Sequence, residues 1–292
     1  MLITRTVTVS ALLALYRKEY LPRKAPNTRK QVIGLHKRIE RDMGAMRLDL
    51  LTPAFLRKWR DKLLKEGYAP GSVRRYMDVL SGPLTIAVRD YDLLPANPLR
   101  KVQKPPETPS RVRTLSATER DALLQACQAS GSPNLYILVV LALHTGARKM
   151  ELMSLTWPHV DLERGMLRLE QTKNGERRSV PVTGLALTLL KDRRRKEPDA
   201  VAVFPANKGG TRPTEIIRPF RLAAARAGLT GMTFHDLRHV FASYLAMSGA
   251  SLTEVAELLG HRSMQMTRRY THYSNSHLSG TVENMGRLFL GG

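Results

Sequence analysis

Apolar residues recur at helical spacing from Ser10 to about Pro95, and no stretch of this region alternates as a strand would. The apolar residues of the first two expected helices are Leu12, Leu13, Tyr16 and Tyr20, and then Val32, Leu35, Ile39 and Met43. The expected helix starts are Asn27-Thr28, Thr52-Pro53 and Pro70-Gly71-Ser72. We therefore predict an all-helical domain over residues 1–98.

Residues 99–113 are rich in proline, lysine and arginine and poor in apolar residues, which predicts an extended basic linker. The remaining region, residues 114–292, opens with a capping-box pattern, Ser116 to Glu119, and is again mostly helical in pattern. Within it, Met166–Val182 alternates around Asn174-Gly175, which indicates a β-hairpin. The predicted fold class is mainly α with a small β-sheet, in two domains.

The charge of the chain points to a polyanionic partner. Lys and Arg number 47 against 25 Asp and Glu, a net charge of +22. Such a field attracts nucleic acid, whereas binding to an anionic membrane would require a basic amphipathic helix or an anchor. The candidate DNA contacts are Arg29, Lys30, Lys37, Arg38, Arg74 and Arg75 in the helical domain, and Lys101, Lys104 and Arg111 in the linker.

The only cysteine, Cys127, rules out an internal disulfide framework. The longest apolar run, Leu135–Leu143, is far shorter than the ~20 residues that span a bilayer. We expect a cytoplasmic protein. The sequence shows no acidic cluster, phosphate-binding loop or zinc-ligand pair, so no cofactor is expected. Cleavage of a phosphodiester would then depend on cationic side chains.

Residues that suit this chemistry lie in the last third of the chain. Thr233 and Asp236 have the spacing of a helix start, and His235 and Arg238 share a face near its positive end, a ready anion site. By itself, a His-x-x-Arg pair is more often a solvated polar face.

A second group follows a helix that Ser251 opens and Gly260 ends, so that His261 is expected in the turn, facing outward. Ser263 is expected to cap a short helix that reaches His272, with Met264 and Thr267 packed inward. Tyr270 then lies beside two arginines, which would lower its pKa. Tyr273 is the rival for a nucleophilic role.

Upstream, Arg148 and Glu151 are three residues apart after a glycine turn, so Glu151 can hold the guanidinium of Arg148 in a fixed orientation. The alternative is a simple surface ion pair.

Taken together, these boxes resemble those of the tyrosine recombinase (phage integrase) family. They are Thr145-Gly-Ala-Arg148-Lys-Met-Glu151, His235-Asp-Leu-Arg238-His239, Leu259-Gly-His261 and Arg269-Tyr270-Thr-His272, with Thr172-Lys173-Asn174-Gly175 as the family's lysine hairpin. The resemblance implies a helical core-binding (SAM-like) domain and a tyrosine-recombinase catalytic domain. Departures are Val240, where a small hydroxyl residue is common, and the lack of room for an arm-binding domain before residue 10.

The resemblance also implies a role for each position. Arg148, Arg238 and His261 would bind the scissile phosphate, Lys173 would protonate the leaving 5′ oxygen, and His235 would accept the proton of Tyr270 or orient the site. Tyr270 would form a 3′-phosphotyrosyl bond, with Glu151 supporting Arg148, and neither metal nor ATP would be needed.

The partners implied are double-stranded DNA with paired half-sites, a homotetramer on that DNA, and an accessory DNA-bending or directionality protein in some systems. Residues 277–290 would form a helix exchanged between subunits, with Leu278, Val282, Met285 and Leu288 as its apolar side. Two alternatives stay open at this point. One is a type IB topoisomerase-like enzyme that relaxes supercoils, and the other is a non-catalytic DNA-binding protein on the same fold.

Overall fold

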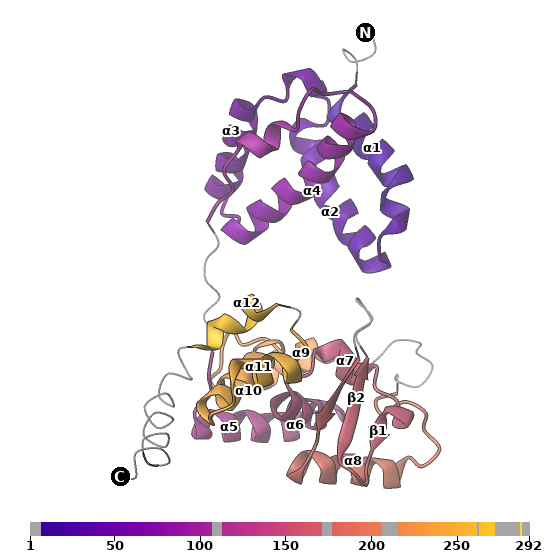
Figure 1. The fold of residues 1–292 in the computed structure, drawn as a ribbon, viewed down its shortest axis with the longest axis vertical. Helices are drawn as coiled ribbons and strands as arrows, with labels where there is room; N and C mark the ends of the chain where they lie inside the picture. The colour runs from indigo at the N-terminus through magenta and orange to yellow at the C-terminus, as the bar shows by residue number, and fades with distance from the viewer. Residues whose placement is uncertain are drawn as a thin grey trace. The chain divides into compact units, whose positions relative to one another are not determined.

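The structure is a computed structural model that describes residues 7–106, 113–170, 177–205, 215–261, 263–271 and 287. The chain divides into two compact units, Met1–Ser110 and Arg111–Gly292 (Figure 1). Each unit has a hydrophobic core of its own.

Among the described residues, the regular elements of the first unit are all helices, and one isolated β-bridge joins Thr8 to Arg47. Its elements are α1 (Val9–Glu19), η1 (Leu21–Arg23), α2 (Pro26–Met43), η2 (Leu48–Leu50), α3 (Pro53–Lys65), α4 (Pro70–Arg89) and η3 (Pro98–Lys101). The predicted starts of α3 and α4 are confirmed, and Thr52 caps α3 by accepting a hydrogen bond from the amide of Phe55. Helix α2 starts before Asn27-Thr28, because Pro26 takes its first position.

The end of the first unit differs from the predicted linker. Leu99 and Val102 are each 6% exposed and belong to the core of this unit. Asn97 holds this segment against α4, since its side-chain amide nitrogen donates to the carbonyl of Ser81 and its side-chain oxygen accepts from the backbone amide of Leu99. The chain therefore leaves the core only after Val102, because the predicted linker carries apolar residues at the spacing of one helical turn.

The second unit is mainly helical. Its helices are α5 (Ala117–Gln128), α6 (Leu135–Thr145), α7 (Lys149–Met153), η4 (Trp157–His159), α8 (Gly184–Lys196), α9 (Ile217–Arg226), α10 (Asp236–Met247), α11 (Leu252–Leu259), α12 (Met264–Thr267) and η5 (Arg268–Tyr270). The capping boxes predicted at Ser116 and Ser251 are both present.

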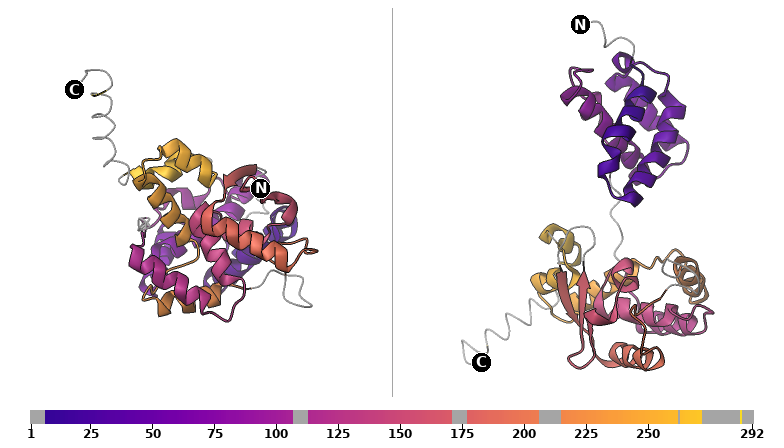
Figure 2. Two further views of the ribbon diagram at one scale, coloured as in Figure 1. Left: turned by 90° about the horizontal axis from the view of Figure 1, so that it is seen from below. Right: turned by 90° about the vertical axis from the view of Figure 1, so that its right-hand side faces the viewer.

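A small antiparallel sheet, in the order β1-β2-β3, completes this unit (Figure 2). Its strands are β1 (Val160–Asp161), β2 (Met166–Glu170) and β3 (Arg177–Pro181). Met166 pairs with Pro181 and Glu170 with Arg177, so β2 and β3 pair as the predicted hairpin does. The predicted turn at Asn174-Gly175 lies outside the described residues. The mainly helical fold with a small sheet is confirmed.

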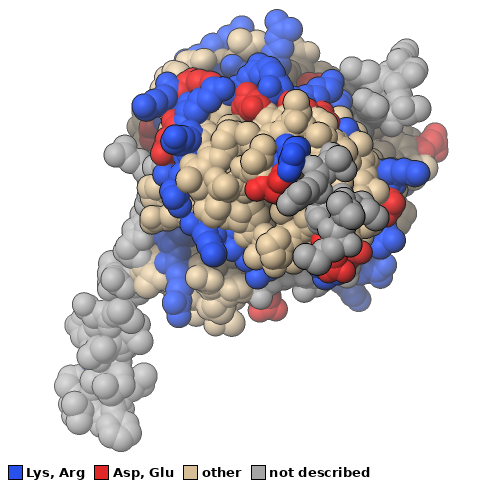
Figure 3. Space-filling model, turned by 90° about the horizontal axis from the view of Figure 1, so that it is seen from above, with Lys and Arg blue, Asp and Glu red and all other residues tan. Residues whose placement is uncertain are grey.

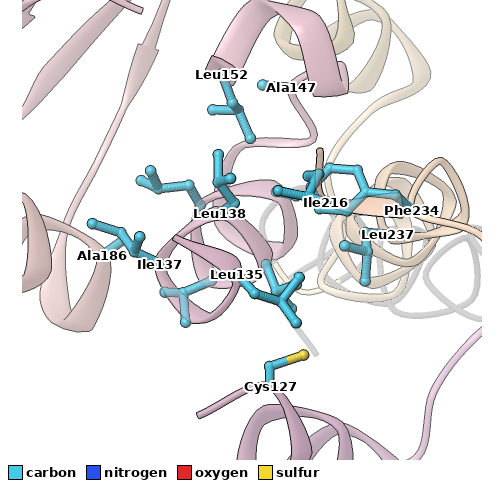
Figure 4. Packing of buried hydrophobic residues seen from close by; sticks show 14 of the residues in the cluster. Cys127, Leu135, Ile137, Leu138, Ala147, Leu152, Ala186, Ile216, Phe234 and Leu237 are labelled. Carbon is cyan, nitrogen blue, oxygen red and sulfur yellow. The ribbon is translucent and has the colours of Figure 1, made fainter. Parts of the chain in front are cut away.

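Helix α6 forms the centre of the core of the second unit (Figure 4). Leu138 and Leu141 are almost completely buried, because α5, α8 and α10 pack around this helix. It ends at Gly146, which has a φ of 61°. A Cβ there would lie 2.3 Å from Cδ1 of Phe241, so both the backbone conformation and the space require glycine. The chain that follows this turn carries Arg148.

Within the described ranges, no helix combines the length and the hydropathy needed to cross a membrane. Across these same ranges, no three His, Cys, Asp or Glu side chains gather as metal ligands would.

Candidate active site

Arg148 lies between the Gly146 turn and α7, where its extended backbone starts the helix. Its amide donates to Oε2 of Glu151 at 2.8 Å, and its guanidinium donates to Oε1 at 2.7 Å. The ion pair predicted from the spacing is therefore present. One carboxylate fixes both the backbone and the side chain of this arginine, whose side chain remains 36% exposed.

Arg178, on β3, is a second arginine bound to the same carboxylate, and sequence reasoning missed it. Its two terminal nitrogens lie 3.2 and 2.8 Å from the Glu151 oxygens, and its Nε donates to the carbonyl of Leu258. Burial alone would raise the pKa of Glu151, but Arg178 and Arg148 hold it below its ordinary value. Arg178 shares the inward face of β3 with Val180, and an arginine at a buried position of a strand was the available signal.

Arg238, on α10, is 4% exposed. Its two terminal nitrogens donate to carbonyl oxygens of two distant segments, Gly146 at 2.8 Å and Leu259 at 2.6 Å. Burial lowers the pKa of Arg238, with Arg148 and Arg178 adding to the effect, to about 9. Arg238 therefore lies close to the other two guanidinium groups, and the site concentrates positive charge.

The start of α10 differs slightly from the prediction. Thr233 does not cap the helix with its hydroxyl; instead its amide and hydroxyl both donate to Oδ2 of Asp236, at 2.7 and 2.9 Å. The helix begins at Asp236, and His235 takes the flanking position.

His261 follows Gly260, whose φ of 64° ends α11 as predicted. The ring is half-buried rather than facing outward, and its Nδ1 lies 2.9 Å from Oγ1 of Thr267. Burial lowers the pKa of His261, with further lowering by Arg238 and Arg148, to about 4. His261 thus belongs to the same cluster as the two predicted arginines.

Tyr270 lies on η5 and is 1% exposed. Burial raises the pKa of Tyr270, and this outweighs the lowering by Arg269 and Arg238, so the predicted decrease is wrong. Of the two side chains expected to pack inward, Thr267 is buried, but Met264 is 45% exposed. The helix predicted from Met264 to His272 is also shorter, because α12 ends at Thr267 and the chain tightens into η5.

His239 is the residue that contacts the hydroxyl of Tyr270, and sequence reasoning gave it no role. Its Nδ1 lies 2.6 Å from that oxygen. The ring of His235, one helical turn earlier, lies edge-on to that of His239, with their centroids 5.2 Å apart. The signal available was the spacing of four between these two histidines, which places them on one face of α10.

Some predicted site residues lie outside the described residues. These are Lys173, the rival nucleophile Tyr273, Arg111, and most of the predicted exchange segment 277–290.

The predicted DNA contacts of the first unit fall into two groups. Arg38 is not available, because its side chain is 9% exposed, donates to Asp42 and Glu66 and lies over the ring of Tyr68. The prediction assumed an exposed arginine, and that assumption is wrong. Arg74 and Arg75 are held within the unit by the carbonyl of Pro105 and by Gln31.

The other candidates lie at the surface. Lys30, Lys37 and Lys101 are exposed, Lys104 is exposed but paired with Asp78, and Arg29 is half-buried. On the face drawn in Figure 3, Lys and Arg side chains are more widespread than Asp and Glu. The first unit therefore offers exposed lysines to a polyanion, while several of its arginines hold the fold.

Comparisons with known proteins show the family of this chain. The model of the phage integrase family matches residues 113–277. The chain is 30% identical over 237 residues to a shufflon-specific DNA recombinase of Escherichia coli, covering 77% of this chain but spanning only 59% of that protein. It is 33% identical over 234 residues to the tyrosine recombinase XerD of Pseudomonas putida, covering 75% of this chain and 76% of that one.

A solved structure of a lambda integrase tetramer bound to a Holliday junction is similar in fold. The TM-score is 0.77 with 22% sequence identity, and the match covers 92% of this chain and 79% of that one.

Proposed function

Because this chain belongs to the phage integrase family, we propose that it is a site-specific recombinase that cuts and rejoins duplex DNA through a covalent bond to Tyr270. The observation that carries the proposal is the convergence of Arg148, Arg238 and His261 around one concentration of positive charge, with Tyr270 close enough to interact with Arg238. Cationic groups fixed in this way stabilise the charge that develops on phosphoryl oxygens in the transition state.

The arginines are oriented before any DNA arrives. Each terminal nitrogen of Arg238 donates one hydrogen bond to a backbone carbonyl group. Because a guanidinium has five N–H donors, three remain for phosphate oxygens. Arg148 is held by Glu151, and 36% of its side chain remains exposed, so its guanidinium is accessible to a phosphate. We assign the non-bridging oxygens of the scissile phosphate to Arg148, Arg238 and His261.

In the proposed reaction, the oxygen of Tyr270 attacks the phosphorus, and the bond to the 5′ oxygen breaks. The products are a 3′-phosphotyrosyl protein and a free 5′ hydroxyl. Lys173, whose assignment rests on the family resemblance, donates the proton to the leaving oxygen. The ester keeps the bond energy, so rejoining to another 5′ hydroxyl consumes no ATP.

We further propose that the chain acts as a tetramer on two DNA sites, each with two half-sites, as the lambda integrase tetramer on a Holliday junction suggests. Exposed lysines of the first unit would contact the DNA backbone, which sets position rather than sequence. Residues 277–290 would tie neighbouring subunits, and accessory DNA-bending or directionality proteins would act through the DNA. Deleting residues 283–292 should abolish pairing of two sites while leaving cleavage of a single site.

The test of this function uses nicked duplexes tiled across the DNA that flanks the chain's own coding sequence. A nick beside the cleavage point releases a short strand, so that the covalent product accumulates. We expect the unaltered protein and Tyr273→Phe to give a denaturation-resistant adduct, and Tyr270→Phe to give none. An adduct with Tyr270→Phe but not with Tyr273→Phe would move the nucleophile to Tyr273. A plasmid with two sites separates recombination from topoisomerase activity, which changes linking number without exchanging flanks.

A further inference from the structure

The nucleophile proposed above already has a hydrogen-bond partner in the protein. The hydroxyl of Tyr270 lies 2.6 Å from Nδ1 of His239. The ring of Tyr270 is packed among Phe241, Ala242 and Leu259, so its oxygen is held at this imidazole by the core. The contact joins α10 to η5, thirty-one residues apart in the sequence.

The protonation states of the two rings suit a proton transfer in one direction. Burial raises the pKa of Tyr270, so its oxygen carries a proton at neutral pH. Burial lowers the pKa of His239, with His235 and Arg269 adding to the effect, to about 4, so this ring is neutral. A neutral imidazole has one acceptor nitrogen, and the best acceptor within reach of the phenol is Nδ1. The Tyr270 hydroxyl is thus the donor and His239 the acceptor.

We propose that His239 is the general base for Tyr270, a proposal that rests on the DNA cleavage proposed above. As the tyrosine oxygen attacks the phosphorus, its O–H bond breaks and the proton forms a new N–H bond at Nδ1 of His239. A P–O bond to Tyr270 forms, the P–O bond to the 5′ oxygen breaks, and that oxygen takes a proton from the general acid. Rejoining runs the steps backwards, and the imidazolium returns the proton to Tyr270.

This assignment replaces the one made from the sequence, in which His235 accepted the proton. Among the hydrogen bonds of the described residues, the Tyr270 hydroxyl has one with His239 and none with His235. His235 is more exposed and lies at the helix start, near Arg148 and Arg238, where its position suits the phosphate rather than the phenol.

Substrate binding strengthens the base at the moment it is needed. The charged and titratable groups that face His239 are His235, Arg269, Asp236, Arg238, Tyr270 and His261. The arginines disfavour the imidazolium, and a phosphate bound at Arg238 and Arg148 offsets their charge. The pKa of His239 therefore rises when DNA binds, toward the pH at which a general base is most effective.

His239→Asn separates proton transfer from positioning, because an amide oxygen accepts the same hydrogen bond but does not take up the proton. With the nicked duplex that gives the most adduct, we expect adduct formation by His239→Asn at pH 7 to be at least about 100-fold slower. The acid limb of the rate profile between pH 4.5 and 9 should disappear, and DNA affinity should be unchanged. His159→Asn is the matched control; its Nδ1 pairs with Thr156 far along the chain from Tyr270, and the rate should stay as in the unaltered protein.

A second measurement needs no DNA. The ultraviolet titration of Tyr270, taken as the difference between the protein with Tyr270 and Tyr270→Phe, should shift toward a pKa near 10 in His239→Ala. The phenol then loses the acceptor that stabilises its protonated form, and part of its burial. An unchanged titration, or an unchanged rate and pH profile in His239→Asn, would overturn the assignment. Failure of the unaltered protein to form an adduct on any duplex, with the titration shifted as expected, would count against the proposed function and leave the contact between the two rings established.

Discussion

Arg178 on β3 binds Glu151 on α7 through both carboxylate oxygens, at 3.2 and 2.8 Å. Because Glu151 also holds Arg148, the sheet and the proposed phosphate site are joined through one carboxylate. A third bond, from Nε of Arg178 to the carbonyl of Leu258, adds the end of α11 to the same assembly. Arg178 therefore positions the site through Glu151 and the end of α11.

Replacing Arg178 with methionine should weaken both the fold and the reaction. Glu151 would keep one partner but lose its second in a nearly buried position, which should lower the free energy of unfolding by about 2–3 kcal/mol. Adduct formation on nicked duplex should slow by about tenfold or more, since Glu151, which orients Arg148, loses the second arginine that fixes its position. Denaturant unfolding and single-turnover cleavage measure the two effects.

Arg177→Met is the matched control, because the neighbouring side chain is 72% exposed and, in the part of the chain that the structure describes, its ion pair is with an exposed Glu170. Its effect should stay within about 0.5 kcal/mol. Equal losses in the two variants would show that the shared carboxylate does not matter.

Gly146→Ala should destabilise the second unit by about 2–4 kcal/mol. The φ of 61° is costly for alanine, and its Cβ would overlap Phe241 and Leu259. Gly131→Ala is the comparison, since nothing lies within 4 Å of a Cβ there and its φ is not in the left-handed range. A thermal-unfolding series on the two variants and the unaltered protein tests this, and similar midpoints for both variants would contradict it.

The first unit should lose stability in mild acid because of His36. This ring is fully buried and edge-on to Tyr16, and burial, with Arg17 adding to it, lowers its pKa from 6.5 to about 4. The unfolded chain then binds the proton more readily, so stability is complete above pH 6.5 and falls toward pH 4, by up to roughly 3 kcal/mol.

Urea unfolding followed by the fluorescence of Trp59, in a Trp157→Phe background, would measure this loss between pH 4.5 and 7.5. His36→Phe should flatten the part of the pH dependence that is due to the imidazole. An identical pH dependence with and without the histidine would remove His36 from the explanation.

Two neighbours on α2 should behave differently toward DNA. Lys37 is exposed, so Lys37→Gln should weaken binding to duplex and reduce the slope of log affinity against log salt by about 0.9, the share of one phosphate contact. Arg38→Gln should instead cost about 3 kcal/mol of stability, because Asp42 stays buried without its main partner. Anisotropy titrations over a range of salt and denaturant unfolding distinguish the two. A salt slope lowered only by Arg38→Gln would reverse their roles.

Features that depend on a few neighbouring residues could be predicted from the sequence. The capping boxes at Ser116 and Ser251, the glycine end of α11 and the pair of Arg148 with Glu151 each close within one helical turn. Backbone geometry alone brings such groups together, so their spacing is sufficient.

Features that depend on packing between distant segments could not be predicted from the sequence. Arg178 meets Glu151 across twenty-seven residues, and His239 meets Tyr270 across thirty-one. The same reason explains the pKa of Tyr270, where the sequence shows the adjacent arginine but not the burial that outweighs it. Arg38 is similar, because its partner Glu66 comes from another helix.

The two carbonyl acceptors of Arg238 come from Gly146 and Leu259, one far upstream and one downstream of it. While the chain is still being synthesised, the downstream acceptor does not yet exist, and Tyr270 is added later still. A nascent or truncated product therefore carries an arginine that lacks one of its two acceptors and has no nucleophile beside it. The proposed capacity to cut DNA therefore arises only after the residues from Gly146 to Tyr270 have all been synthesised and folded together.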